Sequence, residues 1–158
     1  MTASGKPLNY TTAIPATQTA GECQAILAMA GAASVSVRYE DGQPSGLAFT
    51  LKTPHGERAF TLPVNIDGVQ RVLAQAERDG LFATARKRAG TYSSREHATR
   101  VAWRVAKDWL EAVLALIAAK MAPIDEVMLG YLVVNDSGKT LYQSYREREQ
   151  AALEAGSP

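Results

Sequence analysis

The sequence predicts an α+β domain in which a three-stranded antiparallel meander is covered by one long amphipathic helix, with flanking helices. Two observations support this fold class. Apolar and polar residues alternate through three consecutive segments between residues 34 and 63, with short turns between the segments. Apolar residues then recur at three- and four-residue steps from residue 94 to residue 121, which is the period of a helix. A sheet with one apolar face needs a cover, and this helix has the apolar area to provide it.

Size and composition fit one globular domain. The chain has 158 residues, of which 46% are hydrophobic and 21% charged, and its net charge is +1. These values are ordinary for a folded protein and exclude wholesale disorder. We expect a flexible lead-in over residues 1–14, a single domain over residues 15–153 and a frayed tail over residues 154–158. The most apolar run, residues 112–119, is shorter than the roughly 20 residues of a membrane span. Without a signal-peptide pattern, a cytoplasmic protein with no membrane partner is expected.

The first half of the chain contains one helix and the meander. Thr19-Ala20-Gly21-Glu22 has the capping-box pattern, so a first helix is expected to begin there and to end at Gly31. The three predicted strands are residues 34–39, 47–51 and 57–62. Pro63 ends the third strand, because proline has no amide hydrogen to donate to a ladder.

Helices dominate the second half. Asn65 is a suitable cap for a helix that ends at Asp79-Gly80. Ser93 or Ser94 then caps the long helix, which Pro123 ends. Residues 127–134 fit either a short helix or a buried strand, and a last helix begins near Leu141.

A row of cations marks the polar side of the long helix. His97, Arg100, Arg104 and Lys107 follow one another at steps of three, four and three, so they share one stripe. The preceding loop is also basic, and a nucleic-acid backbone is a suitable partner for such a surface. The predicted nucleic-acid-binding residues are Arg86, Lys87, Arg88, Arg95, Arg100, Arg104 and Lys107. The alternative is an ordinary solvated face with helical ion pairs, Glu96–Arg100, Arg104–Asp108 and Lys107–Glu111.

The two tryptophans lie six residues apart on the long helix and therefore cannot share one face. Trp109 falls among the apolar positions and is expected in the core. Trp103 lies on the shoulder of the helix, where it is a candidate interface residue, with contact to the core or the sheet as the alternative. Tyr92 and Trp103 are also candidates for stacking on unpaired bases.

No residue pattern indicates an enzyme. The chain contains neither a P-loop nor a dinucleotide-binding motif. His55, His97 and Cys23 are scattered along it, so neither a metal site nor any cofactor is expected. Cys23 lies within the first predicted helix and is interpreted as a small buried hydrophobic residue. A hydrolase using Cys23 or His97 is a minor alternative.

Several short phrases resemble a family of small uncharacterised proteins from tailed phages, prophages and actinobacterial genomes. They include Asn9-Tyr10-Thr11-Thr12, Thr53-Pro54-His55-Gly56, Val101-Ala102-Trp103-Arg104 and Thr140-Leu141-Tyr142. This resemblance carries no activity or catalytic residues. It implies a mobile-element setting, in which such proteins serve DNA replication, recombination or counter-defence.

Together these observations predict a non-enzymatic, phage-type accessory protein that binds nucleic acid through a basic helix face. Single-stranded DNA binding or annealing is the role that this face suggests. The alternative is a protein-interaction module, such as an inhibitor of a host defence complex or a phage assembly subunit. The sequence therefore leaves open nucleic acid, a host or phage protein, and further copies of the same chain as partners.

Overall fold

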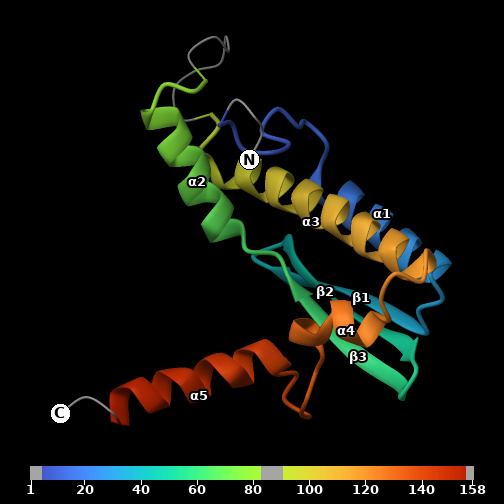
Figure 1. Cartoon of the computed structure of the whole chain (residues 1–158). Helices are drawn as coiled ribbons and strands as arrows, with labels where there is room; N and C mark the ends of the chain where they lie inside the picture. The colour runs from blue at the N-terminus through green and yellow to red at the C-terminus, as the bar shows by residue number, and fades with distance from the viewer. Residues whose placement is uncertain (1–4, 83–90, 156–158) are drawn as a thin grey trace.

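The computed structural model describes residues 5–82 and 91–155 and confirms the predicted α+β fold (Figure 1). One long helix, flanking helices and a three-stranded antiparallel sheet make up the molecule. The elements in chain order are α1 (Ala16–Met29), β1 (Ser34–Glu40), β2 (Gln43–Thr53), β3 (Gly56–Pro63), α2 (Ile66–Arg78), α3 (Arg95–Ala118), α4 (Ile124–Val127), the 3₁₀ helix η1 (Leu129–Tyr131) and α5 (Leu141–Ala155).

The sheet is a meander in the order β1-β2-β3. Its first turn is tight because Asp41 and Gly42 both adopt positive φ, which glycine tolerates well and aspartate better than most residues. Alternate residues of β2 and β3 point to one side, where Phe49 and Phe60 stack with their ring centroids 5.7 Å apart. Both phenylalanines are buried, so this side of the sheet is the core face.

Two helices cover the core face together. α1 packs against β1 and β2, while α3 packs against α1 and α2 (Figure 1). α3 reaches the sheet through Trp103, whose indole Nε1 donates a hydrogen bond of 2.8 Å to the carbonyl oxygen of Pro44. The long helix is therefore surrounded by partners on more than one side.

The starts of three helices were predicted from capping side chains, and two of these predictions are confirmed. Asn65 accepts a hydrogen bond from the amide of Gly68 at the start of α2, and Ser94 accepts one from His97 at the start of α3. The start of α1 was predicted wrongly. α1 begins at Ala16, after Pro15, and Thr19 is fully buried inside it. Proline has a fixed φ and is well suited to precede the first helical turn, so the helix begins earlier than its capping-box pattern indicated.

Part of the predicted lead-in lies against α3. The side-chain amide of Asn9 donates to Asp108 Oδ2 at 2.7 Å. The ring of Tyr10 stacks on Phe82 at 5.0 Å, and its carbonyl oxygen lies 2.7 Å from Nε2 of His97. These contacts attach residues 9 and 10 to the domain, while the predicted boundary at residue 15 stays a prediction.

The segment after α3 combines the two conformations that its sequence left open. α4 and η1 are short helical turns, after which Leu132 forms an isolated antiparallel bridge with Phe60 at the outer edge of β3. Val133 bridges to Thr140, and the chain then enters α5. None of the fifteen residues of α5 is buried, and the helix extends away from the sheet (Figure 1).

Candidate functional site

The cations of α3 that face α1 are already paired with carboxylates. Arg104 Nη1 lies 2.9 Å from Glu22 Oε2, and Lys107 Nζ lies 2.6 Å from Glu111 Oε1 and 3.9 Å from Glu22. The Arg104 and Lys107 side chains are only 20% and 13% exposed. The middle of the predicted stripe therefore lies in a partly covered seam between α1 and α3.

Two cations at the start of α3 are also paired, but at the surface. Arg100 Nη1 lies 2.6 Å from Glu96 Oε1, as the helical spacing predicted. Arg95 pairs with Asp67 of α2, and hydrogen bonding to this guanidinium lowers the pKa of the Asp67 carboxyl. The structure thus brings together Arg95, Arg100, Arg104 and Lys107 on one helix, each beside a carboxylate. The predicted residues Arg86, Lys87 and Arg88 lie outside the described residues.

The two predicted interface aromatics belong to the core, which corrects their assignment. Trp103 is 0% exposed, and its indole hydrogen bond to Pro44 fixes it between α3 and β2. Tyr92 is 5% exposed and packs on Phe82, with ring centroids 4.4 Å apart. Neither ring is available to a base or a partner in this fold, because both are buried in the core.

Trp109 lies at the edge of the core. It is only partly buried, and its ring lies 5.1 Å from that of Tyr131 in η1. This pair lines the surface of the domain beside Pro63. The sequence pattern assigned Trp109 to the core because it shares a helical face with Val105 and Val113. That face extends beyond the part of α3 that α1 and α2 cover.

The single thiol shows no sign of reactivity. Cys23 is fully buried, and this burial raises its pKa to about 11, so the sulfur remains protonated near neutral pH. Among the described residues, no group of three His, Cys, Asp or Glu side chains is placed to hold a metal ion. In the same part of the chain, no helix has the length and apolarity needed to cross a membrane.

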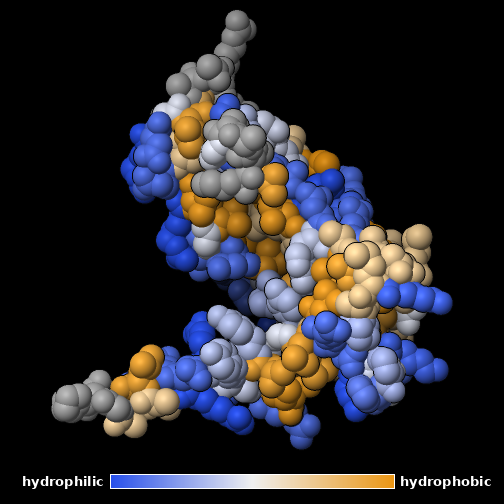
Figure 2. All heavy atoms as spheres, in the orientation of Figure 1, coloured by the Kyte–Doolittle hydropathy of each residue, from blue (hydrophilic) through white to orange (hydrophobic). Residues whose placement is uncertain are grey.

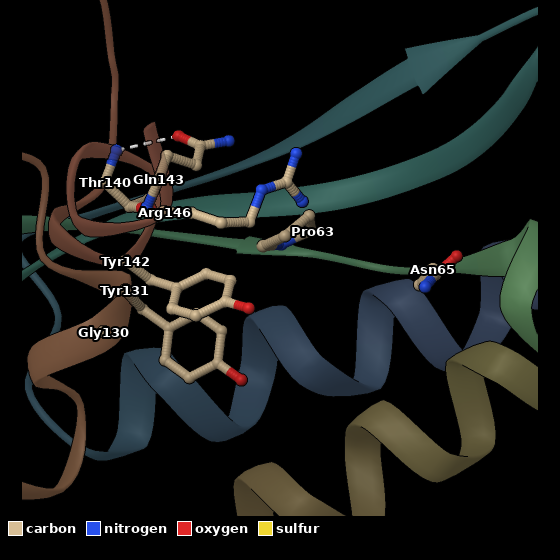
Figure 3. A pocket seen from close by; sticks show the side chains of 8 residues that line it. All are labelled: Pro63, Asn65, Gly130, Tyr131, Thr140, Tyr142, Gln143 and Arg146. Atoms are coloured by element: carbon tan, nitrogen blue, oxygen red, sulfur yellow. Dashed lines mark hydrogen bonds between the residues drawn. The ribbon is translucent and has the colours of Figure 1, made fainter. Parts of the chain in front are cut away.

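A cleft of about 600 Å³ opens beside the first turns of α5, and it is the best candidate site of the described chain. Figure 2 shows the hollow between α5 and the helices of the domain. Its lining includes Pro63, Tyr131, Tyr142, Gln143 and Arg146. In Figure 3 the side chains of Tyr131 and Tyr142 point in the same direction, and the guanidinium of Arg146 extends towards Pro63.

The floor of this cleft continues along the body of the domain. A neighbouring hollow of about 270 Å³ shares Pro63, Asn65 and Tyr131 with the cleft and extends along Val105 and Trp109. Aromatic and aliphatic groups therefore follow one another from α3 to α5. Such a concave surface, apolar with a few polar groups at its rim, is suited to bind another molecule.

A capping box fixes the wall of the cleft. The Thr140 amide donates to Gln143 Oε1 at 2.9 Å, and the Gln143 amide donates to Thr140 Oγ1 at 3.3 Å, as Figure 3 shows for the first bond. Tyr142 lies within this box and is 57% exposed. These residues were not among the predicted site residues. The Thr-x-x-Gln pattern was visible at 140–143, but the approach of η1 to α5 was not.

No protein-family model matches the chain, and neither the curated proteins nor the solved structures contain a significant match. The resemblance to phage and actinobacterial proteins stays a prediction.

Proposed function

We propose that this chain is a non-enzymatic protein-interaction module that binds a polypeptide in the cleft between α5 and the body of the domain. One observation carries the proposal: α5 buries none of its residues, although it forms one wall of an apolar, aromatic-floored cleft. The cleft provides the contact surface, and α5 provides a wall that gains a packing partner when the cleft is filled.

The energetics of α5 support a partner. An isolated helix shorter than about 12–15 residues is marginal in water, and α5 has 15 residues. Its contacts with the domain are concentrated on η1. Its capping box helps to start the helix but does nothing for its far end. A polypeptide lying along α5 would stabilise the remaining turns by covering their side chains.

The residue types in the cleft suit a protein partner. Tyrosine, tryptophan and arginine are enriched at the centres of protein interfaces, and Trp109, Tyr131, Tyr142 and Arg146 all lie along this surface. Tyr142 and the neighbouring Tyr145 are each 57% exposed. Aromatic rings with this exposure provide contact area at low cost in conformational entropy.

Nucleic-acid binding through α3 is the weaker proposal. A cation contributes to backbone binding when its charge is available to a phosphate, and Arg104 and Lys107 are largely covered and face Glu22. The phage setting, with its assembly or counter-defence roles, rests on the sequence resemblance alone. The cleft supports a protein partner without depending on that setting.

Site-specific photocrosslinking tests the proposed function. A benzophenone side chain in place of Tyr142 would lie at the cleft. The same group in place of Tyr39, which is similarly exposed at 55% but lies on β1, is the matched control. We expect crosslinked polypeptide from position 142 and little from position 39, in cells that produce the protein. Equal yields from the two positions, or no product from position 142, would contradict a protein-binding cleft.

A further inference from the structure

We propose that the polypeptide in the cleft is a second copy of this chain, with the two α5 helices lying antiparallel and each entering the cleft of the other. This inference rests on the proposed function of the cleft as a polypeptide-binding site. It adds the identity of the partner and the register of the contact.

One stripe of α5 carries the residues that make the contact. Tyr142, Arg146, Glu149 and Leu153 follow one another at steps of four, three and four, so they lie on one side of the helix. Tyr142 and Arg146 line the cleft (Figure 3). Their side of α5 therefore faces the cleft, and the same side carries Leu153, which is 74% exposed, at the far end.

The stripe is complementary to itself when two copies run in opposite directions. A two-fold axis between positions 147 and 148 places residues equally distant from that point opposite each other. Tyr142 then meets Leu153 of the second copy, and Arg146 meets Glu149. The symmetry forms each contact twice. A single register thus joins apolar to apolar and positive to negative side chains.

A parallel arrangement would lose this complementarity. Each residue of the stripe would then meet its own equivalent, so Arg146 would face arginine and Glu149 would face glutamate. Like charges in direct opposition destabilise an interface. Within the described residues, neither Arg146 nor Glu149 forms an ion pair in the single chain, so both are available to the second copy.

The shape of the molecule leaves room for the second helix. α5 extends away from the sheet (Figure 1), so an antiparallel pair places the two domain bodies at opposite ends of the paired helices. The end of α5 that carries Leu153 then lies at the cleft of the other copy, beside Tyr142 and Tyr131. The cleft volume of about 600 Å³ accommodates several side chains of an incoming helix turn.

Two helices of this length form a small interface. Fifteen residues span about 22 Å, and stable interfaces usually bury about 1,200–2,000 Å² in total. The floor of each cleft adds area on both sides, through Pro63 and Tyr131. We therefore expect a reversible dimer that dissociates on dilution.

Charge reversal tests both the partner and the register. Arg146→Glu places a carboxylate opposite Glu149 at both sites, and Glu149→Arg places a guanidinium opposite Arg146 at both sites. Each variant should self-associate at least about tenfold more weakly than the unchanged chain, because like charges across an interface are strongly unfavourable. In an equimolar mixture, a dimer of one copy of each variant has opposite charges at both sites, so the mixture should recover the association. The double variant Arg146→Glu/Glu149→Arg restores opposite charges at both sites and should self-associate like the unchanged chain.

Sedimentation velocity over a concentration series measures these associations, and circular dichroism of each variant verifies its fold. Arg148→Glu is the matched control, because Arg148 lies on another side of α5 from the stripe. It should leave the association unchanged. If a single variant loses its helix content, the double variant decides the matter, since a recovered dimer supports the pairing and an absent dimer overturns it.

Other results separate this inference from the proposed function. A chain that remains monomeric at all concentrations overturns the dimer. If position 142 then crosslinks to a different protein, the cleft still binds a polypeptide and the proposed function survives. The register is overturned if neither single charge reversal weakens self-association, or if the double variant fails to restore it. Absence of both the dimer and any crosslink overturns both.

Discussion

At the scale of single residues, the two tryptophans of α3 show how burial divides one helix. Trp103 is fully buried with its indole bonded to Pro44, whereas Trp109 is partly exposed beside Tyr131. The sequence placed Trp109 in the core and left Trp103 open between an interface residue and a residue in contact with the core or the sheet. Helical periodicity identifies residues that share a face, but α3 contacts helices and the sheet on several sides. How many faces of a helix are covered depends on tertiary packing, which the periodic pattern of its sequence does not reveal.

This difference leads to a prediction for stability. Trp103→Phe keeps an aromatic ring but removes the donor to the Pro44 carbonyl, leaving a buried acceptor and a small void. The free energy of unfolding should fall by about 1–3 kcal/mol, as measured by urea denaturation. Trp109→Phe is the matched control and should cause a smaller loss. Equal losses, or a larger loss for Trp109→Phe, would show that the assignment of the two rings is wrong.

At the scale of elements, the predictable parts are those with strong local signals. Strand alternation, the Asn65 and Ser94 caps and the helical ion pair between Glu96 and Arg100 all followed from spacing. The pairing of Arg104 was not predictable in this way. Asp108 was its expected helical partner, but the structure pairs Arg104 with Glu22 of α1, since the packing of the two helices brings that carboxylate closer.

The capping box of α5 provides a test at this scale. Thr140→Ala removes the hydroxyl that accepts the Gln143 amide, which usually costs about 0.5–2 kcal/mol of helix stability. Amide hydrogen exchange in the first turns of α5 should become several-fold faster, while exchange in α3 stays unchanged. Gln143→Glu is the control, because a glutamate also accepts the Thr140 amide and should preserve protection. Unaltered exchange in Thr140→Ala would mean that the cap does not hold α5.

At the scale of the whole molecule, the predicted function depended on whether a basic stripe was open to solvent. Cation spacing identified the stripe but not the carboxylates that the other helices bring to it. The cleft was harder still to predict from the sequence, because it forms where residues 63–65, η1 and α5 meet. Fold class was therefore easier to predict than the site, since the fold follows from local patterns and the site from distant contacts.

Paired cations predict weak affinity for nucleic acid. Fluorescence anisotropy with labelled single- and double-stranded DNA should show little binding at moderate salt, since four of the predicted cations already face carboxylates. Glu22→Gln leaves Arg104 without its carboxylate and should increase any binding observed at low salt. Glu126→Gln, a charge-matched change on α4, should have a smaller effect. Tight binding by the unchanged chain that falls steeply with salt would favour the nucleic-acid proposal instead.

The bridge between Leu132 and Phe60 covers part of a strand edge that other chains could otherwise pair with. An open strand edge is a template for pairing with other chains. The backbone at residues 132–133 occupies part of the outer edge of β3, and the Val133 amide donates to the Ala59 carbonyl at 2.9 Å. A chain shortened to end after Val134 would lose α5 and the contacts of residues 139–141 with this segment, but keep the residues that form the bridge. A chain ending before Leu132 would expose the edge of β3 and leave its backbone groups open to pairing with neighbouring chains.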